Sequence, residues 1–365
     1  MNKIAVVAAG GTGGHLFPAQ ALAEALIARG WQIVLASDER VAAFAETFPA
    51  KERIGLSART FKSGDPVGMA LAGVSILRGI FQARAALRRI DPAVVVGFGG
   101  YPSVPGLLAG ITQGRPTVMH EQNAVMGRAN RRLVGYVTAV ACAFPVLQKA
   151  PERIARTATV VGNPVRPEIR ALIDEPYLPP EPEGPIRLLI TGGSQGARLL
   201  SELMPQAIAA LPEALRNRLH VQQQTRKESM DSARATYADA NVEAEIAPFF
   251  RDMAGRLKAA HLVVGRSGAG SVCEFAIAGK PAILIPLAIA LDDDQGQNAR
   301  VMAEAGGAEI ARESQLTVEV MAGALAKLLS NPARLARMAA GARSIARPDA
   351  AERLADLVEA TARLR

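Results

Sequence analysis

The sequence predicts an α/β protein of two doubly wound, Rossmann-like domains that face each other across a cleft. Short apolar runs typical of buried parallel strands alternate with segments of helical spacing along the 365-residue chain. A glycine-rich turn follows the first apolar run of each half, at residues 10–14 and 192–197. A proline-rich stretch at residues 164–185 separates the two halves.

Composition narrows the possible classes of protein. Apolar residues make up 49% and charged residues 21%, as in an ordinary globular protein. Aromatic residues are only 4%, so we expect no nucleic-acid partner despite the net charge of +8. The basic surface could meet anionic lipid or phosphate-bearing substrates instead. Cys142 and Cys273 have no CxxC spacing and fit buried thiols in a reducing compartment.

The chain opens with a strand, a glycine turn, a helix and a second strand. Residues 3–9 form the first strand, because this apolar run is too short for an export signal, and residues 32–36 form the second. Such a unit could bind a dinucleotide with Asp38 on a ribose, so a nicotinamide-dependent oxidoreductase is a rival hypothesis. Leu16 stands where the third fingerprint glycine would be, which counts against it.

A long helix follows. Asp65 is a good cap and Pro66 suits the first helical position, while Asp91-Pro92 ends the helix near Ile90. Its apolar residues fit a stripe facing the core, with a solvated basic face opposite. Alternatively, the helix end or the loop at 61–68 lies on anionic lipid. The basic face is formed by Arg78, Arg84, Arg88 and Arg89.

Further strands bring polar residues to the same sheet edge. The strand at 93–96 ends in a second glycine-rich turn, and the strand at 117–119 is followed by His120-Glu121-Gln122-Asn123. Carboxyl ends of parallel strands share one edge, so we expect both groups beside residues 10–14. Polar residues directly after a buried strand indicate function, although a plain surface loop is the alternative. No segment is apolar enough to span a membrane: residues 93–111 contain five glycines and two prolines.

The second half repeats the alternation. We expect domains over residues 1–163 and 186–345, joined by a linker over 164–185, and a terminal helix over 346–365 that packs back on the first domain. Strands are expected at 186–190, 221–224, 243–247, 261–264 and 283–285. Helices are expected at 227–239, 251–260, 318–329, 332–346 and 350–365.

The stretch Val264 to Glu274 has the chemistry of a nucleotide site. Small residues at a helix start let a phosphate approach bare N–H groups over Ala269 to Val272. Glu274, one turn further on, can accept hydrogen bonds from two ribose hydroxyls. The alternative is an ordinary strand-to-helix turn capped by Ser271.

A loop of aspartates and amides follows the strand at 283–285. Asp292-Asp293-Asp294 contains a DxD pattern, which binds Mg²⁺ or Mn²⁺ in some enzymes, but adjacent aspartates more often face solvent or cap helices. We therefore predict no metal site and no required cofactor. The amides of Gln295, Gln297 and Asn298 suit sugar hydroxyls.

Seven motifs in series resemble one family. They are GGTGGHLFPA (Gly10 to Ala19), GFGGYPSVP (Gly97 to Pro105), HEQNAVMGRAN (His120 to Asn130), GNPVR (Gly162 to Arg166), GGSQGA (Gly192 to Ala197), RSGAGSVCE (Arg266 to Glu274) and the amide loop ending at Asn298-Ala299. In order and over almost the whole chain, they resemble the MurG family of bacterial glycosyltransferases, which make lipid II of peptidoglycan.

The resemblance implies a GT-B fold and an inverting transfer. The second domain would hold UDP-N-acetylglucosamine, and the first would hold undecaprenyl-diphospho-N-acetylmuramoyl-pentapeptide, lipid I, and lie on the anionic cytoplasmic face of the inner membrane as a peripheral protein. N-acetylglucosamine would pass to the 4-hydroxyl of the muramoyl sugar. A non-catalytic protein that binds nucleotide sugar or lipid remains the alternative.

The matched motifs supply the expected site residues. Glu274 would hold the ribose, the Phe250 backbone in PFFRDM the uracil, and Asn123 with Gln295 the sugar. The complete donor-binding set is Thr12, Gly13, Gly14, Asn123, Arg166, Ser194, Phe250, Ala269, Gly270, Ser271, Glu274 and Gln295. The acceptor-binding set is Gly10, Gly11, Gly99, Gly100 and Tyr101. Asp294 and the pair Gly270-Ser271 depart from the family pattern, which affects donor selectivity.

An inverting transfer also needs a base for the attacking hydroxyl. His15 is the first candidate for the catalytic base, because the ordinary pKa of histidine is near neutrality. Glu121 is the alternate. A structural hydrogen bond from His15 to the neighbouring loop is the competing explanation of that residue.

Overall fold

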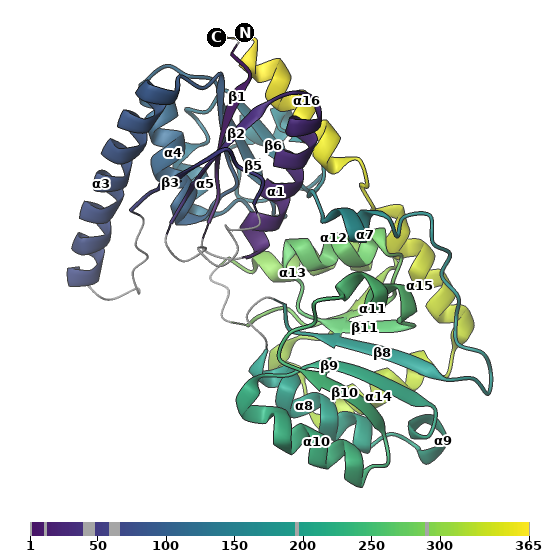
Figure 1. The fold of residues 1–365 in the computed structure, drawn as a ribbon. Coiled ribbons are helices and arrows are strands. Elements are labelled where there is room, and N and C mark those ends of the chain that lie inside the picture. Colours follow the sequence, from purple (N-terminus) through teal and green to yellow (C-terminus); the bar gives the residue numbers. More distant parts are fainter. Residues whose placement is uncertain are drawn as a thin grey trace. The chain divides into compact units, whose positions relative to one another are not determined.

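The computed structural model describes residues 2–10, 13–38, 48–57, 66–193, 197–288 and 292–364. The chain divides into two compact units (Figure 1). The N-terminal unit comprises Met1–Arg166 and Arg347–Arg365, and the C-terminal unit comprises Pro167–Ala346. In the described part of the chain, no helix is both long and apolar enough to cross a bilayer.

The N-terminal unit is built on a parallel sheet of order β3-β2-β1-β4-β5-β6-β7. Its continuous apolar runs form strands buried on both faces, as parallel sheets require. The strands are β1 (Ile4–Ala8), β2 (Gln32–Ser37), β3 (Glu52–Gly55), β4 (Val94–Gly97), β5 (Thr117–Glu121), β6 (Ala139–Cys142) and β7 (Thr159–Val160).

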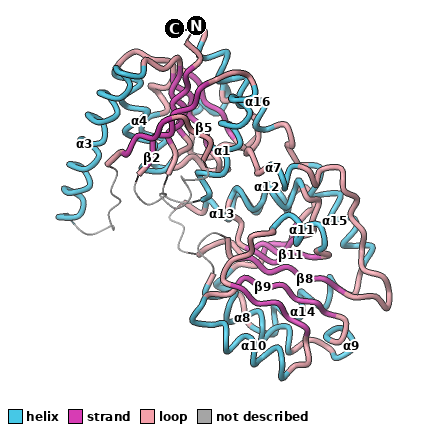
Figure 2. The backbone as a smooth tube through the Cα atoms, viewed as in Figure 1, coloured by secondary structure: helices cyan, strands magenta, loops and turns pink. Residues whose placement is uncertain are grey.

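Helices cover both faces of this sheet (Figure 1). They are α1 (Gly13–Ala28), α3 (Pro66–Ile90), α4 (Gly100–Thr112), α5 (Arg128–Leu133), α6 (Glu152–Thr157) and α16 (Ala350–Ala362). Alternate residues of β1 divide the core: Val7 packs with α1 and α16, whereas Val6 packs with α3 and α4. The tube in Figure 2 shows the same layering.

The last helix belongs to the N-terminal unit. Leu354 and Val358 of α16 are buried in the same core cluster as the α1 side chains. At the helix surface, Arg29 donates to Asp356 at 2.6 Å and the Trp31 indole donates to Glu359 at 2.8 Å. The chain therefore ends on the sheet with which it began, after it has built the second unit.

The C-terminal unit repeats the strand order, as β10-β9-β8-β11-β12-β13, again all parallel. The strands are β8 (Ile186–Thr191), β9 (Leu219–Gln224), β10 (Glu243–Ala247), β11 (Leu262–Gly265), β12 (Ala282–Leu284) and β13 (Ala308–Ile310). The helices are α7 (Pro167–Arg170), α8 (Arg198–Ala209), α9 (Glu213–Arg216), α10 (Met230–Asp239), α11 (Met253–Ala259), α12 (Ala269–Ile277), α13 (Asp294–Glu304), α14 (Val318–Leu329) and α15 (Pro332–Ser344), with short 3₁₀ turns at Lys227–Ser229 and Glu313–Gln315.

The proline-rich stretch expected as a linker over 164–185 groups largely with the C-terminal unit, whose boundary lies at residue 167. Leu172 is buried, and the Tyr177 hydroxyl donates to the His261 carbonyl at 2.8 Å. Lys258 forms an ion pair with Glu175 at 2.6 Å. Prolines give this segment an irregular backbone, but its apolar and charged side chains still anchor it to the unit.

Candidate active site

Glycine turns meet in pairs at the carboxyl edge of each sheet. In the N-terminal unit, β1 and β4 are neighbours with Ala8 opposite Gly97, so the turns after them begin side by side. In the C-terminal unit, β8 and β11 are neighbours with Thr191 opposite Gly265. At both places the strand order reverses, and ligands of doubly wound sheets bind at such points.

His15 lies at the N-terminal pair of turns. It belongs to the first turn of α1, and a Cβ added to Gly100 would come within 3.3 Å of its Nε2 atom. Gly99 and Gly100 have φ angles of +80° and +70°, which residues other than glycine rarely adopt. The structure thus brings together His15, Gly99 and Gly100, which the sequence assigned to two different motifs.

The electrostatic environment keeps His15 neutral. Burial lowers the pKa of His15, and the nearby Phe98 backbone and Gln122 side chain offset this only in part. Among the residues that the structure describes, its buried Nδ1 atom has no hydrogen-bond partner. A neutral imidazole with an unpaired nitrogen is able to accept a proton.

Glu121, the alternate base, has a different setting. It is the last residue of β5, is buried, and accepts hydrogen bonds from the Asn123 N–H at 3.0 Å, the Gly127 N–H at 2.9 Å and the Asn130 amide at 2.7 Å. Burial raises the pKa of Glu121, and these hydrogen bonds oppose the rise. Both carboxylate oxygens are used to fold the loop that carries Asn123.

Two buried polar residues beside this edge were not assigned a role from the sequence. His120 donates from Nε2 to the Gly162 carbonyl at 2.9 Å, and burial lowers the pKa of His120 to about 4. Asn163 is 2% exposed, yet neither atom of its amide has a partner in the described part of the chain. The signal was present in GNPVR, where a polar amide follows a strand and a glycine.

The other predicted site residues of the N-terminal unit have the following positions. A Cβ on Gly10 would lie 2.9 Å from Pro102, so Gly10 allows the two turns to approach closely. The Arg166 guanidinium lies over the Phe17 ring at 5.1 Å. Gly13 and Gly14 begin α1, and Tyr101 lies in the first turn of α4. Gly11 and Thr12 lie outside the described residues.

Leu16 is incompatible with a dinucleotide fingerprint. It occupies the position of the third glycine and is 1% exposed, within the core cluster under α1. A glycine there would let helix and strand approach each other, whereas leucine fills that space. The local packing therefore disfavours the oxidoreductase hypothesis.

In the C-terminal unit the predicted nucleotide motif has the expected secondary structure. Helix α12 begins at Ala269, directly after a cap at Gly268, and Glu274 lies one turn further along it, partly exposed. Ala269 is buried, and Gly270 and Ser271 are half-buried. A helix start with small residues and a carboxylate one turn away fits a phosphate next to a ribose.

The Phe250 ring packs against the side chain of an arginine. The ring is buried, and the Arg256 guanidinium lies over it at 3.8 Å. The Asp252 carboxylate accepts from the Gly255 N–H at 2.8 Å and so starts α11 two residues later than expected. This stacking fixes the backbone at Phe250, which was expected to meet the base. Ser194 lies outside the described residues.

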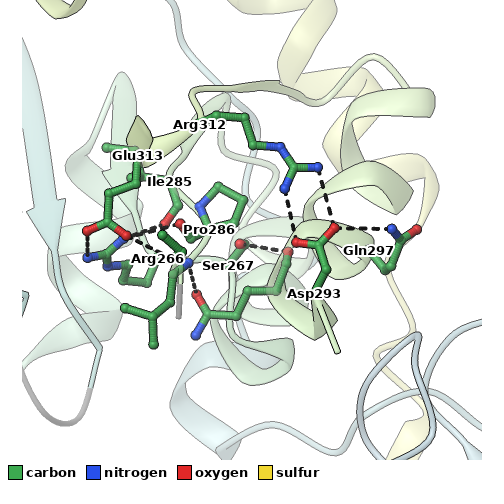
Figure 3. Close-up of polar contacts among 11 residues, drawn as sticks. Arg266, Ser267, Ile285, Pro286, Asp293, Gln297, Arg312 and Glu313 are labelled. Carbon is green, nitrogen blue, oxygen red and sulfur yellow. Dashed lines mark hydrogen bonds and ion pairs between the residues drawn. The ribbon is translucent and has the colours of Figure 1, made fainter. Parts of the chain in front are cut away.

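A network of polar contacts surrounds the start of α13 (Figure 3), and Gln295 lies in the first turn of this helix. Arg266 donates to the Ile285 carbonyl at 3.1 Å and pairs with Glu313 at 3.0 Å, and Glu313 accepts from the Ala288 N–H at 2.8 Å. The Ser267 hydroxyl donates to the Gln295 carbonyl at 2.8 Å. The sequence did not assign this role to Arg266 or Glu313.

Gln295 itself keeps one half of its amide available. Its Oε1 atom accepts from the Leu287 N–H at 3.1 Å, so the oxygen is occupied. Within the described ranges, its amide nitrogen makes no hydrogen bond and remains a donor for a ligand.

Asp293, in the loop of aspartates, is bonded to other side chains of the protein. Asp293 has a φ of +51°, precedes α13 as its cap residue, and pairs with Arg312 at 3.0 Å (Figure 3). Gln297 donates to the same carboxylate at 3.3 Å. Over the residues described, no group of three or more His, Cys, Asp or Glu side chains is arranged to hold a metal ion.

Comparison with known proteins gives matches over both units. Residues 5–142 match the glycosyltransferase family 28 N-terminal domain, and residues 187–354 match the family 28 C-terminal domain. The chain is 74% identical over 363 residues to the UDP-N-acetylglucosamine--N-acetylmuramyl-(pentapeptide) pyrophosphoryl-undecaprenol N-acetylglucosamine transferase of Phenylobacterium zucineum (strain HLK1), and the match covers 100% of each chain. It is 64% identical over 363 residues to the enzyme of the same name from Caulobacter vibrioides, again with 100% of each chain covered.

Solved structures agree with these matches. The crystal structure of Acinetobacter baumannii MurG superimposes with a TM-score of 0.78 at 31% identity, covering 98% of this chain and 99% of that one. A glycosyltransferase of kitacinnamycin superimposes with a TM-score of 0.70 at 20% identity, covering 98% of each chain, which supports the fold alone. The predicted fold class, two Rossmann-like parallel-sheet domains of the GT-B kind, is confirmed.

Proposed function

We propose that this chain, which belongs to glycosyltransferase family 28, transfers N-acetylglucosamine from UDP-N-acetylglucosamine to the 4-hydroxyl of lipid I and so makes lipid II. One observation carries the proposal: the chain matches enzymes named for this transfer from end to end, at 74% identity. The two places where the strand order reverses, one in each unit, supply residues suited to each part of the reaction.

The C-terminal unit binds the donor. The N–H groups at the start of α12 stabilise the diphosphate, Glu274 accepts from the ribose hydroxyls, and the backbone at Phe250 reads the uracil. The free amide nitrogen of Gln295 donates to the sugar. Asn123 and Arg166 are predicted donor contacts of the N-terminal unit.

The transfer is a single displacement with inversion. The acceptor 4-hydroxyl attacks C1 of N-acetylglucosamine, the bond from C1 to the UDP oxygen breaks, and UDP leaves with the electron pair. His15 takes the hydroxyl proton, because burial keeps its imidazole neutral and its Nδ1 has no partner among the described residues. The N–H groups at the start of α12 stabilise the charge on the leaving diphosphate, with no metal required in this scheme.

Glu121 positions the site in this scheme. Its oxygens accept hydrogen bonds from the N–H groups of Asn123 and Gly127. A proton taken from substrate would therefore compete with the hydrogen bonds that fold this loop. We therefore assign the base to His15 and leave Glu121 the task of holding Asn123 in place. Gly99, Gly100 and Tyr101 form the start of α4, where N–H groups meet the acceptor diphosphate.

The exposed face of α3 provides the contact with an anionic membrane. Leu71, Val74, Leu77 and Phe81 are between 53% and 71% exposed. At 100° per residue these side chains share one arc with Arg78 and Arg88, which are also exposed. An apolar stripe flanked by arginines suits the surface of an anionic bilayer. The protein thus acts as a peripheral enzyme at the cytoplasmic face of the inner membrane, where a polyprenyl acceptor lies.

The reaction is tested by release of UDP from UDP-N-acetylglucosamine, with and without a short-chain analogue of lipid I. We expect release that depends on the acceptor and is absent with UDP-glucose. Binding of UDP without acceptor-dependent release would contradict the transfer and leave a binding protein. Binding of NAD in preference to UDP would restore the oxidoreductase.

The membrane contact has its own assay. Arg78→Glu with Arg88→Glu reverses two exposed charges on α3, and we expect weaker sedimentation with vesicles rich in anionic lipid. The control is Arg234→Glu with Arg337→Glu, the same change in net charge on exposed positions of the C-terminal unit. Equal loss of binding in both double variants would contradict a specific α3 surface.

A further inference from the structure

We propose that Gln224 is a positioning residue that fastens the base-reading loop to the diphosphate-reading loop of the donor site. The inference rests on the proposed function, since it takes the donor to be a nucleoside diphosphate sugar. The base loop is residues 248–252, which contains Phe250. The diphosphate loop follows β8: its described residues here are 191–193, and it leads to Ser194, a member of the predicted donor-binding set whose motif GGSQGA we assign to the diphosphate.

The sheet places Gln224 between these loops. It is the last residue of β9, and β9 lies between β8 and β10 in the sheet. The diphosphate loop follows β8 and the base loop follows β10. The side chain at the carboxyl end of the middle strand can therefore reach both neighbouring loops.

The contacts confirm that it reaches both. The Gln224 amide nitrogen donates to the Gly193 carbonyl at 3.1 Å and to the Pro248 carbonyl at 3.2 Å. Its oxygen accepts from the Thr191 hydroxyl at 3.0 Å. The Thr191 oxygen in turn accepts from the Gly193 N–H at 3.3 Å. One amide thus fixes a carbonyl in each loop.

Only an amide meets these requirements. Gln224 is 5% exposed, whereas its partner Gly193 is half-buried and Pro248 is exposed, so a buried amide joins two loops that lie nearer the surface. A glutamate would set an oxygen against two carbonyl oxygens, and a leucine would leave both carbonyls unpaired. Because the loops contact opposite ends of one nucleotide, this residue couples recognition of uracil to recognition of diphosphate.

The neighbouring glutamine is a matched control. Gln223 is fully buried, and successive side chains of a strand point to opposite faces. Its amide donates to the Leu200 carbonyl at 3.1 Å and accepts from the Tyr237 hydroxyl, which ties α8 to α10 within the core. The two glutamines have similar burial and hydrogen bonding, but only Gln224 contacts the donor loops.

The experiment compares Gln224→Leu with Gln223→Leu in the full chain. We expect Gln224→Leu to raise the KM for UDP-N-acetylglucosamine about tenfold, because the two loops lose the hydrogen bonds that join them, with the acceptor KM unchanged. Gln223→Leu lowers Tm and leaves the donor KM as it is. Calorimetry adds a second signature: UDP binding weakens more than uridine binding in Gln224→Leu, because the two loops no longer act together.

Thr191→Val is the second variant in case Gln224→Leu does not fold. It removes the hydroxyl from the same network, and we expect a donor KM shift in the same direction but smaller. An unchanged donor KM in folded Gln224→Leu or Thr191→Val, or an equal shift in Gln223→Leu, would overturn the proposal. Wild-type turnover reports separately on the proposed function, so the two failures are distinguishable.

Discussion

The carboxyl edges of the two sheets differ in how completely their buried polar side chains are hydrogen-bonded to protein groups. In the C-terminal unit, Gln224, Arg266 and Glu313 are bonded to protein groups in neighbouring loops. In the N-terminal unit, His15 Nδ1 and both amide atoms of Asn163 are buried without partners in the part of the chain that the structure describes. The two sites share one topology but differ in what their polar atoms contact.

This difference has a physical explanation. A polar network whose members are all satisfied is rigid, so the C-terminal unit presents loops already shaped for the nucleotide. A buried polar atom without a partner costs about 1–3 kcal/mol, so the N-terminal unit retains such atoms at the expense of stability. We interpret them as groups kept for substrate. The C-terminal unit has exceptions: among the described residues, the Thr225 hydroxyl and the Nε atoms of Arg216 and Arg256 also lack a partner.

The largest expected effect comes from His15→Ala. Loss of a general base should lower kcat by about 100-fold or more, while the KM for UDP-N-acetylglucosamine stays within about threefold. The matched control is His220→Ala, a half-exposed histidine paired with Glu243 in the C-terminal unit. A kcat reduced by less than about tenfold would remove His15 from catalysis and leave it a structural role.

The pH dependence of kcat sharpens the same assignment. The reaction needs neutral His15, and burial lowers the pKa of His15 below its ordinary value near 6.5. The rate should therefore hold as pH falls from 8 to about 6.5 and decline only below that, as the imidazole takes a proton. An acid limb that persists unchanged in His15→Ala would assign it to another group.

Glu121→Gln should act mainly on stability. The substitution puts an amide nitrogen where donors from Asn123, Gly127 and Asn130 now meet an oxygen, so the free energy of unfolding should fall by about 1–3 kcal/mol. Thermal unfolding measures this against Glu152→Gln, an exposed glutamate of the same unit. If Tm is unchanged and the acid limb of kcat disappears, Glu121 rather than His15 is the base.

The smallest effect is expected for Glu313→Gln. Weakening the contact with Arg266 should loosen the start of α13, where Gln295 lies, and raise the donor KM about threefold to tenfold. Glu309→Gln is the control, because Glu309 of β13 pairs with Arg334 of α15 instead. An equal donor KM shift in both variants would mean a general loss of stability.

The wild-type protein provides the matching pH test. Burial raises the pKa of Glu313, but hydrogen bonds from Arg266 and the Ala288 N–H outweigh it and hold the pKa below its usual value. The contribution of the pair to stability is then fully present above the ordinary glutamate pKa and is lost as pH falls through the lowered one. The donor KM should stay constant from pH 8 down to about 5.

Much of the fold could be predicted from the sequence because buried parallel strands are continuous apolar runs. Helix α3 has the bounds expected from its proline start and its Asp91-Pro92 end. Several elements were not predicted, and β3 and α4 show why. Strand β3 is an edge strand with alternating exposure and few apolar residues. Helix α4 forms although it contains Pro102 and Pro105: Pro102 lies in the first turn, where its nitrogen would have no helical partner, whereas Pro105 lies inside the helix and costs one hydrogen bond.

The site could be predicted only as far as motifs report it. The position of Glu274 one turn into α12 follows from local sequence alone. The contacts of Gln224 with Pro248 and of Arg266 with Glu313 join segments far apart in the chain, and no local pattern indicates them. The same holds for the lowered pKa of His15, which results from its burial in the folded chain.

Photolabelling with 5-azido-UDP-N-acetylglucosamine tests the central comparison most directly, because the reactive group is on the uracil and reports which unit holds the base. The account predicts label in the peptide that contains Phe250, reduced by excess UDP and reduced in Gln224→Leu at the same probe concentration. Label confined to residues 10–17 or 97–101 of the N-terminal unit would contradict the account, since it would place the nucleotide on the wrong sheet.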